Sequence, residues 1–345
     1  MTQTIPTLSL GKSLASAEGK QEFLAQLRDT AHTYGFFYLQ DYGIDSALVN
    51  KVLSLSRKFF SLPEQEKLEI AMVKSPYFRG YNRAGLEHTR GKPDWREQVD
   101  IGPEQAALEL DGASPNWKRL IGPNQWPSTL PDLKGNILKY QAAVTALGIQ
   151  LTELLAEALG QDKDVFKPVY TPAPNQLLKI IRYPGRGASE SNQGVGAHKD
   201  SGFVTILLQE KIGGLQVEGE NGWIDAPPVP GTFVINIGEL LELASNGYLR
   251  ANVHRVVSPP SDSDRLSVAF FFGANLSATI PVLSLPEALQ ARARGVTQDP
   301  SNPLFNEVAK NYLKSRLRSH PDVARAHHAD LLDAAERDRK VASAY

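Results

Sequence analysis

The chain of 345 residues contains no cysteine and only two methionines. The missing thiols exclude disulfide bonds, thiolate catalysis, iron–sulfur clusters and zinc sites built from cysteine. Any metal ion bound by this protein would therefore have to be held by nitrogen and oxygen atoms.

The chain also lacks a large excess of charge and any long apolar run. Its formal net charge of -1 gives no electrostatic reason to expect a nucleic acid or an anionic membrane as partner. No apolar run is long enough to span a bilayer, and the N-terminus, MTQTIPTLSLGK, lacks the pattern of a signal peptide. We therefore expect a cytoplasmic protein, and no motif indicates an obligate protein partner.

The first half of the chain carries the periodicity of amphipathic helices. Apolar residues recur at intervals of three and four over residues 18–34 and 45–60, on either side of a short apolar run, 36–39, that predicts a buried strand. Residues 133–158 predict a long helix. Residues 63–126 are rich in Gly, Pro and charged residues, a composition equally typical of a binding loop and of a plain connection.

After Lys167 the pattern changes to short runs of β-branched and aromatic residues separated by Gly, Pro, Asn and Asp. These runs are residues 176–183, 202–209, 214–217, 222–226, 232–237, 252–258 and 265–272. Such strands favour a sandwich, jelly roll or barrel, and because the helices precede them, a doubly wound sheet is disfavoured. Helical patterns return after Leu285 and end in a polar stretch, 322–345, that predicts a surface helix or a frayed tail. The expected fold class is α+β with a mainly β core.

The stretch GAHKDSG, residues 196–202, places an imidazole and a carboxylate two residues apart. Side chains alternate between the two faces of an extended strand, so His198 and Asp200 share one face while Lys199 points to the other. A pair of this kind is common by chance, and it indicates a metal site only when further ligands join it.

A third ligand follows in SNGYLRANVHRVVSPP, residues 245–260, which carries His254 after an Asn-Gly turn. Two prolines and a polar loop then lead to a strand that begins Arg265-Leu266-Ser267. This hairpin-like arrangement predicts His254 and Arg265 on neighbouring strands. Arg265 and Ser267, two residues apart, are expected to point to one face.

Together these residues meet one chemical requirement. Two histidines and a carboxylate on one side of a metal leave its other side open, which suits iron(II) with oxygen and a chelating co-substrate. An arginine beside a hydroxyl suits a carboxylate, because the guanidinium donates two parallel charge-assisted hydrogen bonds. A bidentate 2-oxo acid anchored by its far carboxylate could supply the electrons that oxygen activation needs.

Several ordered motifs carry a family resemblance: HKDSGFVTILLQ (198–209), GGLQV (213–217), PGTFVINIGELLE (230–242), SNGYLRANVHRV (245–256) and RLSVAFF (265–271). With them the chain resembles the iron(II)/2-oxoglutarate-dependent dioxygenase superfamily, and more narrowly the branch typified by isopenicillin N synthase. The resemblance extends to GFFYLQDYGI (35–44), KFFSLPEQEK (58–67) and RYP (182–184), and covers most of the chain to about residue 285.

The resemblance implies a double-stranded β-helix, or jelly roll, within a single unit. Residues 1–110 would form an N-terminal helical and loop region, 111–165 the supporting long helix, 166–285 the jelly-roll core, and 286–345 the C-terminal helices and tail. The iron(II) ligands would be His198, Asp200 and His254. Arg265, Ser267 and Tyr183 would bind the far carboxylate of 2-oxoglutarate, and Arg255, on the opposite face from His254, would form a structural salt bridge.

The function implied is the coupling of oxidative decarboxylation of 2-oxoglutarate, with O2, to hydroxylation of a small organic molecule. Desaturation or ring closure is open to the same chemistry. Two alternatives remain: an iron-dependent oxidase that does not use 2-oxoglutarate, and a non-catalytic jelly-roll protein that binds a metal or a small ligand.

The prime substrate of this branch lies between the iron, the N-terminal loops and the C-terminal helices. On that basis the expected substrate contacts are Arg79, Tyr81, Arg96, Gln98, Phe203, Phe271 and Asn275. The arginines in the loops hint at an acidic substrate.

Overall fold

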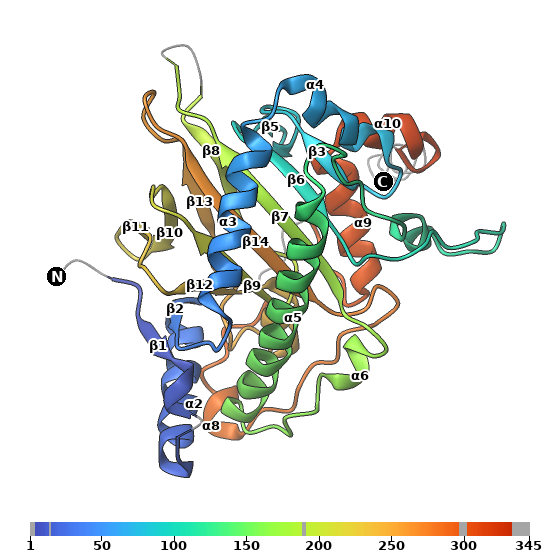
Figure 1. Ribbon diagram of the computed structural model, residues 1–345. Coiled ribbons are helices and arrows are strands. Elements are labelled where there is room, and N and C mark those ends of the chain that lie inside the picture. Colours follow the sequence, from blue (N-terminus) through green and yellow to red (C-terminus); the bar gives the residue numbers. More distant parts are fainter. Residues whose placement is uncertain (1–3, 14, 188–190, 297–301, 333–345) are drawn as a thin grey trace.

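The computed structural model describes residues 4–13, 15–187, 191–296 and 302–332 (Figure 1). Its centre is an 8-stranded sheet of order β1-β2-β12-β9-β14-β7-β6-β3. The bounds of these strands are Thr7–Ser9, Phe36–Gln40, Phe233–Ile237, Val204–Gln209, Arg265–Gly273, Asn175–Tyr183, Glu97–Ile101 and Gly80–Asn82. Except for the parallel pair β1 and β2, neighbouring strands are antiparallel.

A second, 4-stranded sheet has the order β11-β10-β13-β8. Its strands are Gly222–Asp225, Leu215–Gly219, His254–Val257 and Gln193–His198. Apolar side chains from both sheets form one buried cluster, which includes Ile181, Val195, Val217, Val234 and Val256. The two sheets therefore pack face to face, as expected of a jelly roll, and a small hairpin of β4 (His88–Thr89) and β5 (Lys92–Pro93) lies beside β8.

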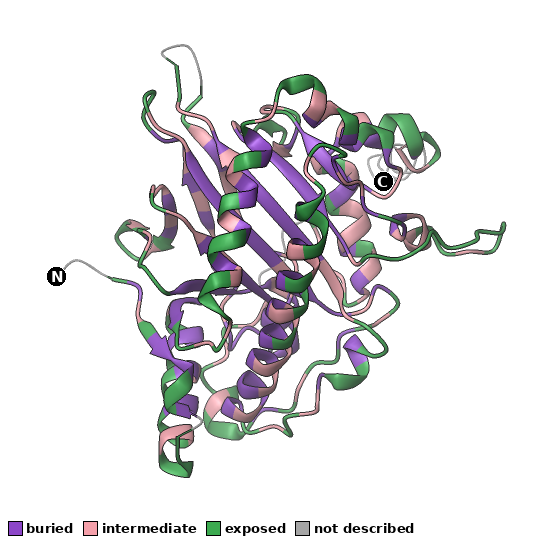
Figure 2. Ribbon diagram, in the orientation of Figure 1, coloured by how far each residue is buried: buried purple, intermediate pink, exposed green. Residues whose placement is uncertain are grey.

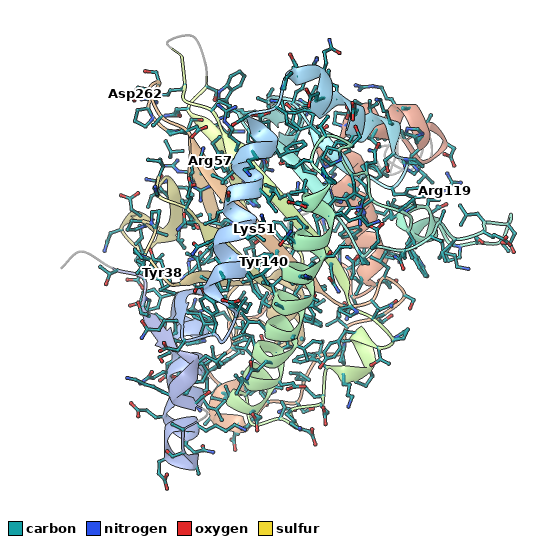
Figure 3. The ribbon with its side chains drawn as sticks, in the orientation of Figure 1. Tyr38, Lys51, Arg57, Arg119, Tyr140 and Asp262 are labelled. Carbon is teal, nitrogen blue, oxygen red and sulfur yellow. The ribbon has the colours of Figure 1, made fainter. Side chains whose placement is uncertain are left out.

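Helices cover the outer face of the large sheet (Figures 1 and 2). The predicted N-terminal helices are α2 (Ala17–Thr33) and α3 (Ser46–Phe60), and Asp45 caps α3 by accepting a hydrogen bond from the Ala47 N–H. The predicted long helix is α5 (Asp132–Ala158), whose apolar stripe is buried together with Tyr140 (Figure 3). Arg57 of α3 pairs with Glu210 and Asp264 at the ends of sheet strands.

Shorter elements complete the chain. They are α1 (Leu10–Ser13), α4 (Glu64–Lys67), η1 (Leu68–Ile70), η2 (Met72–Lys74), η3 (Asn116–Leu120), α6 (Lys167–Tyr170), α7 (Glu239–Ala244), α8 (Glu287–Gln290), α9 (Val308–Ser319) and α10 (Pro321–His327). Among the described residues no helix is long and apolar enough to cross a membrane.

The predicted pairing of the strands that carry His254 and Arg265 is wrong. Strand β13 pairs with β10 and β8, whereas β14 pairs with β7 and β9 in the other sheet. The two prolines and the polar loop before Arg265 carry the chain from one sheet to the other, a connection that a tight hairpin turn would not allow. Both residues nevertheless lie on the facing surfaces of the two sheets.

The C-terminal helices pack more firmly than a frayed tail would, although residues 333–345 lie outside the described part. His320 is fully buried after α9 and contacts Asn82 and Arg316 through its ring nitrogens. His328 stacks on Phe78. The sequence pattern could not reveal these contacts, because they join the C-terminus to residues that precede it by more than two hundred positions.

Burial lowers the pKa of His320 to about 4, although Glu87 and Asp100 nearby oppose this shift. Unfolded chains bind a proton at this histidine below pH 6.5 while folded chains remain neutral, so stability is lost as the pH falls from 6.5 towards 4. Between pH 7.5 and pH 4.5 we expect the free energy of unfolding of wild type to fall by about 3 kcal/mol more than that of His320→Gln, as measured by urea unfolding. His88→Gln, at a more exposed position, is the control; an equal pH dependence in wild type and His320→Gln would contradict the assignment.

Candidate active site

One group of three ligating side chains stands out in the described part of the chain. His198 lies at the end of β8, Asp200 two residues further on, and His254 at the start of β13, directly paired with His198. Their ligand atoms all lie within 4.8 Å of one another. The Asp200 Oδ1 atom is 3.4 Å from His198 Nε2 and 3.6 Å from His254 Nε2, so one ion could contact all three.

Backbone carbonyls orient the two imidazoles. His198 Nδ1 lies 2.8 Å from the Gly196 carbonyl and His254 Nδ1 lies 3.2 Å from the Asn252 carbonyl. Only a protonated Nδ1 can donate to a carbonyl, so both rings leave Nε2 free to bind a metal. Phe36 of β2 holds the His254 ring by an edge contact, with ring centroids 5.1 Å apart.

Two side chains of the large sheet fix the carboxylate. Thr205 Oγ1 donates to Asp200 Oδ2 at 2.6 Å, and Asn236 Nδ2 donates to the same oxygen at 2.8 Å. With Oδ2 held in this way, Oδ1 turns towards the histidines as a single ligand atom. Asn236 was not predicted; a polar amide within the otherwise apolar run of β12 marks it in the sequence, but its partner depends on how the strands pair.

The charges of these groups suit a cation. Burial alone would raise the pKa of Asp200, but the His254 and His198 rings lower it, so the carboxylate stays ionised. Burial and the nearby His198 lower the pKa of His254 to about 4, which keeps its Nε2 lone pair available at neutral pH. For His198 burial is the largest single effect and lowers the pKa, but the hydrogen bond and the charge of Asp200, together with the Gly196 carbonyl, outweigh it, so the pKa is raised.

Lys199 points away from this cluster, as the alternation predicts, and its Nζ lies 2.9 Å from Glu242 of α7. The strand itself ends at His198, so Asp200 reaches the cluster from the irregular segment that follows it. The expected salt bridge of Arg255 is not formed with any described residue. Its guanidinium lies instead over the Trp223 ring and donates to Gln216.

The buried guanidinium of Arg265 lies at the first residue of β14. Arg265 is 0 % exposed, donates to Ser267 Oγ at 3.0 Å and to Gln209 Oε1 at 2.8 Å, and lies over the ring of Tyr183, its partner on β7. All three neighbours are uncharged, its Nε has no partner, and burial lowers its pKa. A buried cation without an anion is costly, so this site fits a ligand carboxylate. Gln209 was not predicted, although it shares a face with Thr205 by the strand period.

Two family models match the chain. One, described as the N-terminal region of non-haem dioxygenases in morphine synthesis, matches residues 5–129, and the other, the 2OG-Fe(II) oxygenase superfamily, matches residues 174–274. A 2-oxoglutarate-dependent dioxygenase, frbJ, of Dothideomycetidae sp. is 38 % identical over 93 % of this chain and 90 % of its own length. The chain belongs to the 2OG-Fe(II) oxygenase superfamily.

Further relatives agree with this assignment. The homoarginine-6-hydroxylase 2-ODD-C23.1 of Arabidopsis thaliana is 33 % identical over 85 % of this chain and 89 % of its own. The crystal structure of Neurospora crassa T7H in complex with alpha-KG superposes with a TM-score of 0.72 at 28 % identity, covering 90 % of this chain and 95 % of that one. The oxygenase is thus an oxidoreductase of the jelly-roll type that uses iron(II), 2-oxoglutarate and O2.

The structure separates the predicted substrate residues into two groups. Arg96, Gln98 and Phe271 lie on the sheet face that carries Thr205 and Tyr183, because Gln98 pairs with Ile181 and Phe271 with Thr205. Arg96 precedes Gln98 by two positions and lies close enough to His198 and Arg265 to affect both electrostatically. Arg79 lies at the far end of the same face, beyond Asp100.

The other three predicted residues of the oxygenase lie elsewhere. Tyr81 packs against Phe59 of α3 and donates to Glu97, on the helix-covered face. Phe203 packs with Phe166 and Phe272 in the helix-side core, and Asn275 accepts hydrogen bonds from Ser277 within a turn after β14. Strand alternation separates Tyr81 from its neighbours on the inner face, and a residue count along the loose segment 63–126 could not set that register.

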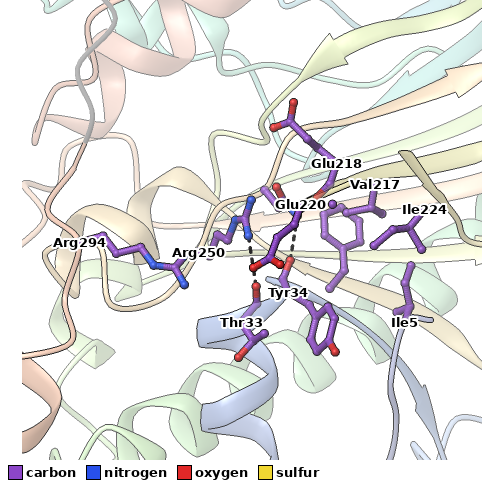
Figure 4. Close-up of a pocket in the computed structure, with 12 residues that line it drawn as sticks. Ile5, Thr33, Tyr34, Val217, Glu218, Glu220, Ile224, Arg250 and Arg294 are labelled. Atoms are coloured by element: carbon purple, nitrogen blue, oxygen red, sulfur yellow. Dashed lines mark hydrogen bonds between the residues drawn. The ribbon is translucent and has the colours of Figure 1, made fainter. Parts of the chain in front are cut away.

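Figure 4 shows a cavity of about 160 Å³. Phe36, whose ring contacts His254, is among the residues that line it. Ile5, Tyr34, Arg250 and Arg294 contribute to its lining. None of the three candidate metal ligands lines it. It is therefore separate from the metal centre of the oxygenase.

Proposed function

We propose that His198, Asp200 and His254 hold iron(II) and that Arg265, Ser267, Tyr183 and Gln209 hold the far carboxylate of 2-oxoglutarate. The observation that supports this most strongly is the Arg265 guanidinium, which is buried and forms no salt bridge with a described carboxylate. By strand register it lies on the same sheet face as Thr205, which holds Asp200 of the His-Asp-His cluster. A bidentate arginine–carboxylate pair would satisfy it.

Bound iron with 2-oxoglutarate supplies the oxygen-activating chemistry, and the protein supplies orientation and a dry site. Thr205 and Asn236 hold Oδ2 of Asp200, so only Oδ1 would bind the metal ion. Other coordination positions of the ion would then remain open. Arg265 with its neighbours would hold the far carboxylate of the co-substrate and so orient it towards the metal ligands. The apolar side chains between the two sheets would limit the access of water to the bound co-substrate.

We infer a small polar molecule as the prime substrate, bound over Arg96, Gln98 and Phe271. Relatives with named small-molecule reactions or ligands support this size class: the homoarginine-6-hydroxylases and T7H crystallised with thymine. Arg96 Nε and Gln98 Oε1 are both buried without a partner, one as donor and one as acceptor. The positive charge of Arg96 is already balanced by Glu87 at 2.8 Å and Asp94 at 3.4 Å. An acidic group on the substrate would therefore have to bind a different cationic side chain.

Succinate formation tests this proposal. Purified protein with iron(II), 2-oxoglutarate and O2 is screened against a metabolite library, and we expect succinate release to rise at least about tenfold with a true substrate. Omission of 2-oxoglutarate separates the oxidase alternative, which would still convert its substrate. A visible absorption band on adding iron(II) and 2-oxoglutarate without oxygen is expected, and its absence would favour a non-catalytic binding protein.

A further inference from the structure

Four arginines are buried in the described part of the chain: Arg79, Arg96, Arg265 and Arg316. Arg96 pairs with Glu87 and Asp94, and Arg316 pairs with Asp100 at 2.7 Å. Arg265 and Arg79 have no carboxylate partner among the described residues. The feature that marks the proposed 2-oxoglutarate anchor therefore occurs a second time.

Arg79 has more unpartnered guanidinium nitrogens than Arg265. It is 3 % exposed, donates a long hydrogen bond of 3.4 Å from Nη2 to the Leu120 carbonyl, and also interacts with the Tyr312 hydroxyl. Its Nε and Nη1 atoms have no partner. Burial lowers the pKa of this guanidinium, which reflects the cost of keeping it charged there. The nearby Asp100 and Tyr312 offset part of this cost. Asp100, however, is paired with Lys179 and Arg316, and no described carboxylate forms a salt bridge with Arg79.

The chain has made room for this guanidinium. It lies against Gly102, where a Cβ atom would overlap it. Asn124 holds Gly102 in place by accepting from its N–H at 2.8 Å and donating to its carbonyl at 3.0 Å. A glycine at this position permits the close approach of the charged group to the backbone.

Helix α9 supplies the other side of the site. Tyr312 Oη accepts a hydrogen bond from Arg316 Nη2 at 3.3 Å and lies beside Arg79. Burial alone would raise the pKa of Tyr312, but the Arg316 and Arg79 guanidinium groups lower it below its usual value. Two guanidinium groups, those of Arg79 and Arg316, thus face this hydroxyl, and their positive charge would also favour a ligand anion beside it.

An apolar row connects Arg79 to the metal cluster. Gly102 continues β6, and the register of β6 with β7 makes Leu177 its neighbour. Leu177 pairs with Phe271, and Phe271 pairs with Thr205 beside the metal cluster. These three inter-strand steps span about 14 Å. A molecule lying over Leu177 and Phe271 could reach from Arg79 to the metal.

We propose that Arg79, with Tyr312, binds a carboxylate of the prime substrate, so that the substrate class is a small carboxylic acid with an apolar body. This rests on the proposed function and deepens it. The carboxylate would accept hydrogen bonds from Arg79 Nε and Nη1, the apolar body would lie over Leu177 and Phe271, and the reacting C–H bond would face the metal. Tyr312 contributes to the site because its phenol can donate to the same carboxylate.

The test uses 4-phenylbutyrate and its uncharged carboxamide, which share one apolar body. Both are titrated into the full-length protein loaded with iron(II) and saturating 2-oxoglutarate without oxygen, so that Arg265 is already occupied. We expect the carboxylate to bind at least about tenfold more tightly than the amide, and Arg79→Met to remove this preference. Arg83→Met, an exposed arginine four residues on that pairs with Glu64, is the matched control and should keep it.

Stability separates binding from a structural role. If Arg79 serves a ligand, Arg79→Met should leave the melting temperature of the ligand-free protein unchanged or higher, because it removes an unpaired buried charge. Gly102→Ala, which displaces the guanidinium without deleting it, should weaken carboxylate binding as well. Equal binding of acid and amide by wild type, or an acid preference that survives Arg79→Met, overturns the proposal. Succinate formation from 2-oxoglutarate alone tests the oxygenase function separately, since it does not depend on Arg79.

Discussion

Replacing Asp200 with Ala should remove iron(II) binding and reduce turnover of 2-oxoglutarate by about a thousandfold or more, because a bound metal contributes several kcal/mol to the reaction. Asp200 is the single anionic ligand of the cluster, and its Oδ1 atom faces both histidines. Without it, two neutral imidazoles would hold the ion weakly. Anaerobic iron titration and succinate release measure the two effects.

Asp225→Ala is the control for this substitution, because Asp225 is exposed on β11 and bonds only to Gln216 among the described side chains. It should bind iron like wild type. Circular dichroism should show that both variants remain folded, although Asp200→Ala leaves Thr205 and Asn236 without their common acceptor. Undiminished iron affinity in Asp200→Ala would refute the assignment of the ligands.

Replacing Arg265 with Met should raise the KM for 2-oxoglutarate by about 100-fold or more, the effect of losing one buried charge-assisted pair. The guanidinium is fully buried and has only uncharged neighbours, so its charge is compensated only when the co-substrate carboxylate is bound. Iron affinity without 2-oxoglutarate should not change, because Arg265 does not contact the metal ligands.

Arg255→Met is the matched control. This arginine follows His254 on β13, faces away from it, and lies over the Trp223 ring of β11. It should leave the KM for 2-oxoglutarate as in wild type. Arg265→Met should also unfold at the same urea concentration as wild type or a higher one when no ligand is present. A wild-type KM in Arg265→Met would show that another group anchors the co-substrate.

Local pattern predicted the helices and most strands well. Residues 45–60 and 133–158 have apolar side chains at helical spacing, Asp45 caps α3, and Gly160 with positive φ follows α5, so both helices are explained by local sequence. Most strands of the core were also predicted, because runs of β-branched and aromatic residues bounded by turn residues are typical of strands. Short strands such as β1 and β3 were missed, since three residues carry no period.

The candidate site was predicted where it depends on spacing within one strand. Arg265 and Ser267 are two residues apart on β14 and point to one face. Asn236 and Gln209 were missed, because their roles depend on which strand lies beside which. The same limit applies to Tyr81, whose face is set by its pairing with Val99.

The sequence by itself determined the kinds of ligand available, the mainly β core and the set of motifs shared with the superfamily. Only the tertiary structure decided that His254 and Arg265 lie in opposing sheets. It also decided that Arg96 pairs with Glu87 and Asp94, whereas Arg79 forms no salt bridge with a described carboxylate. The physical reason is that charge balance inside a protein depends on contacts between residues distant in the chain. The sequence alone therefore does not show whether a buried arginine forms a salt bridge with a carboxylate.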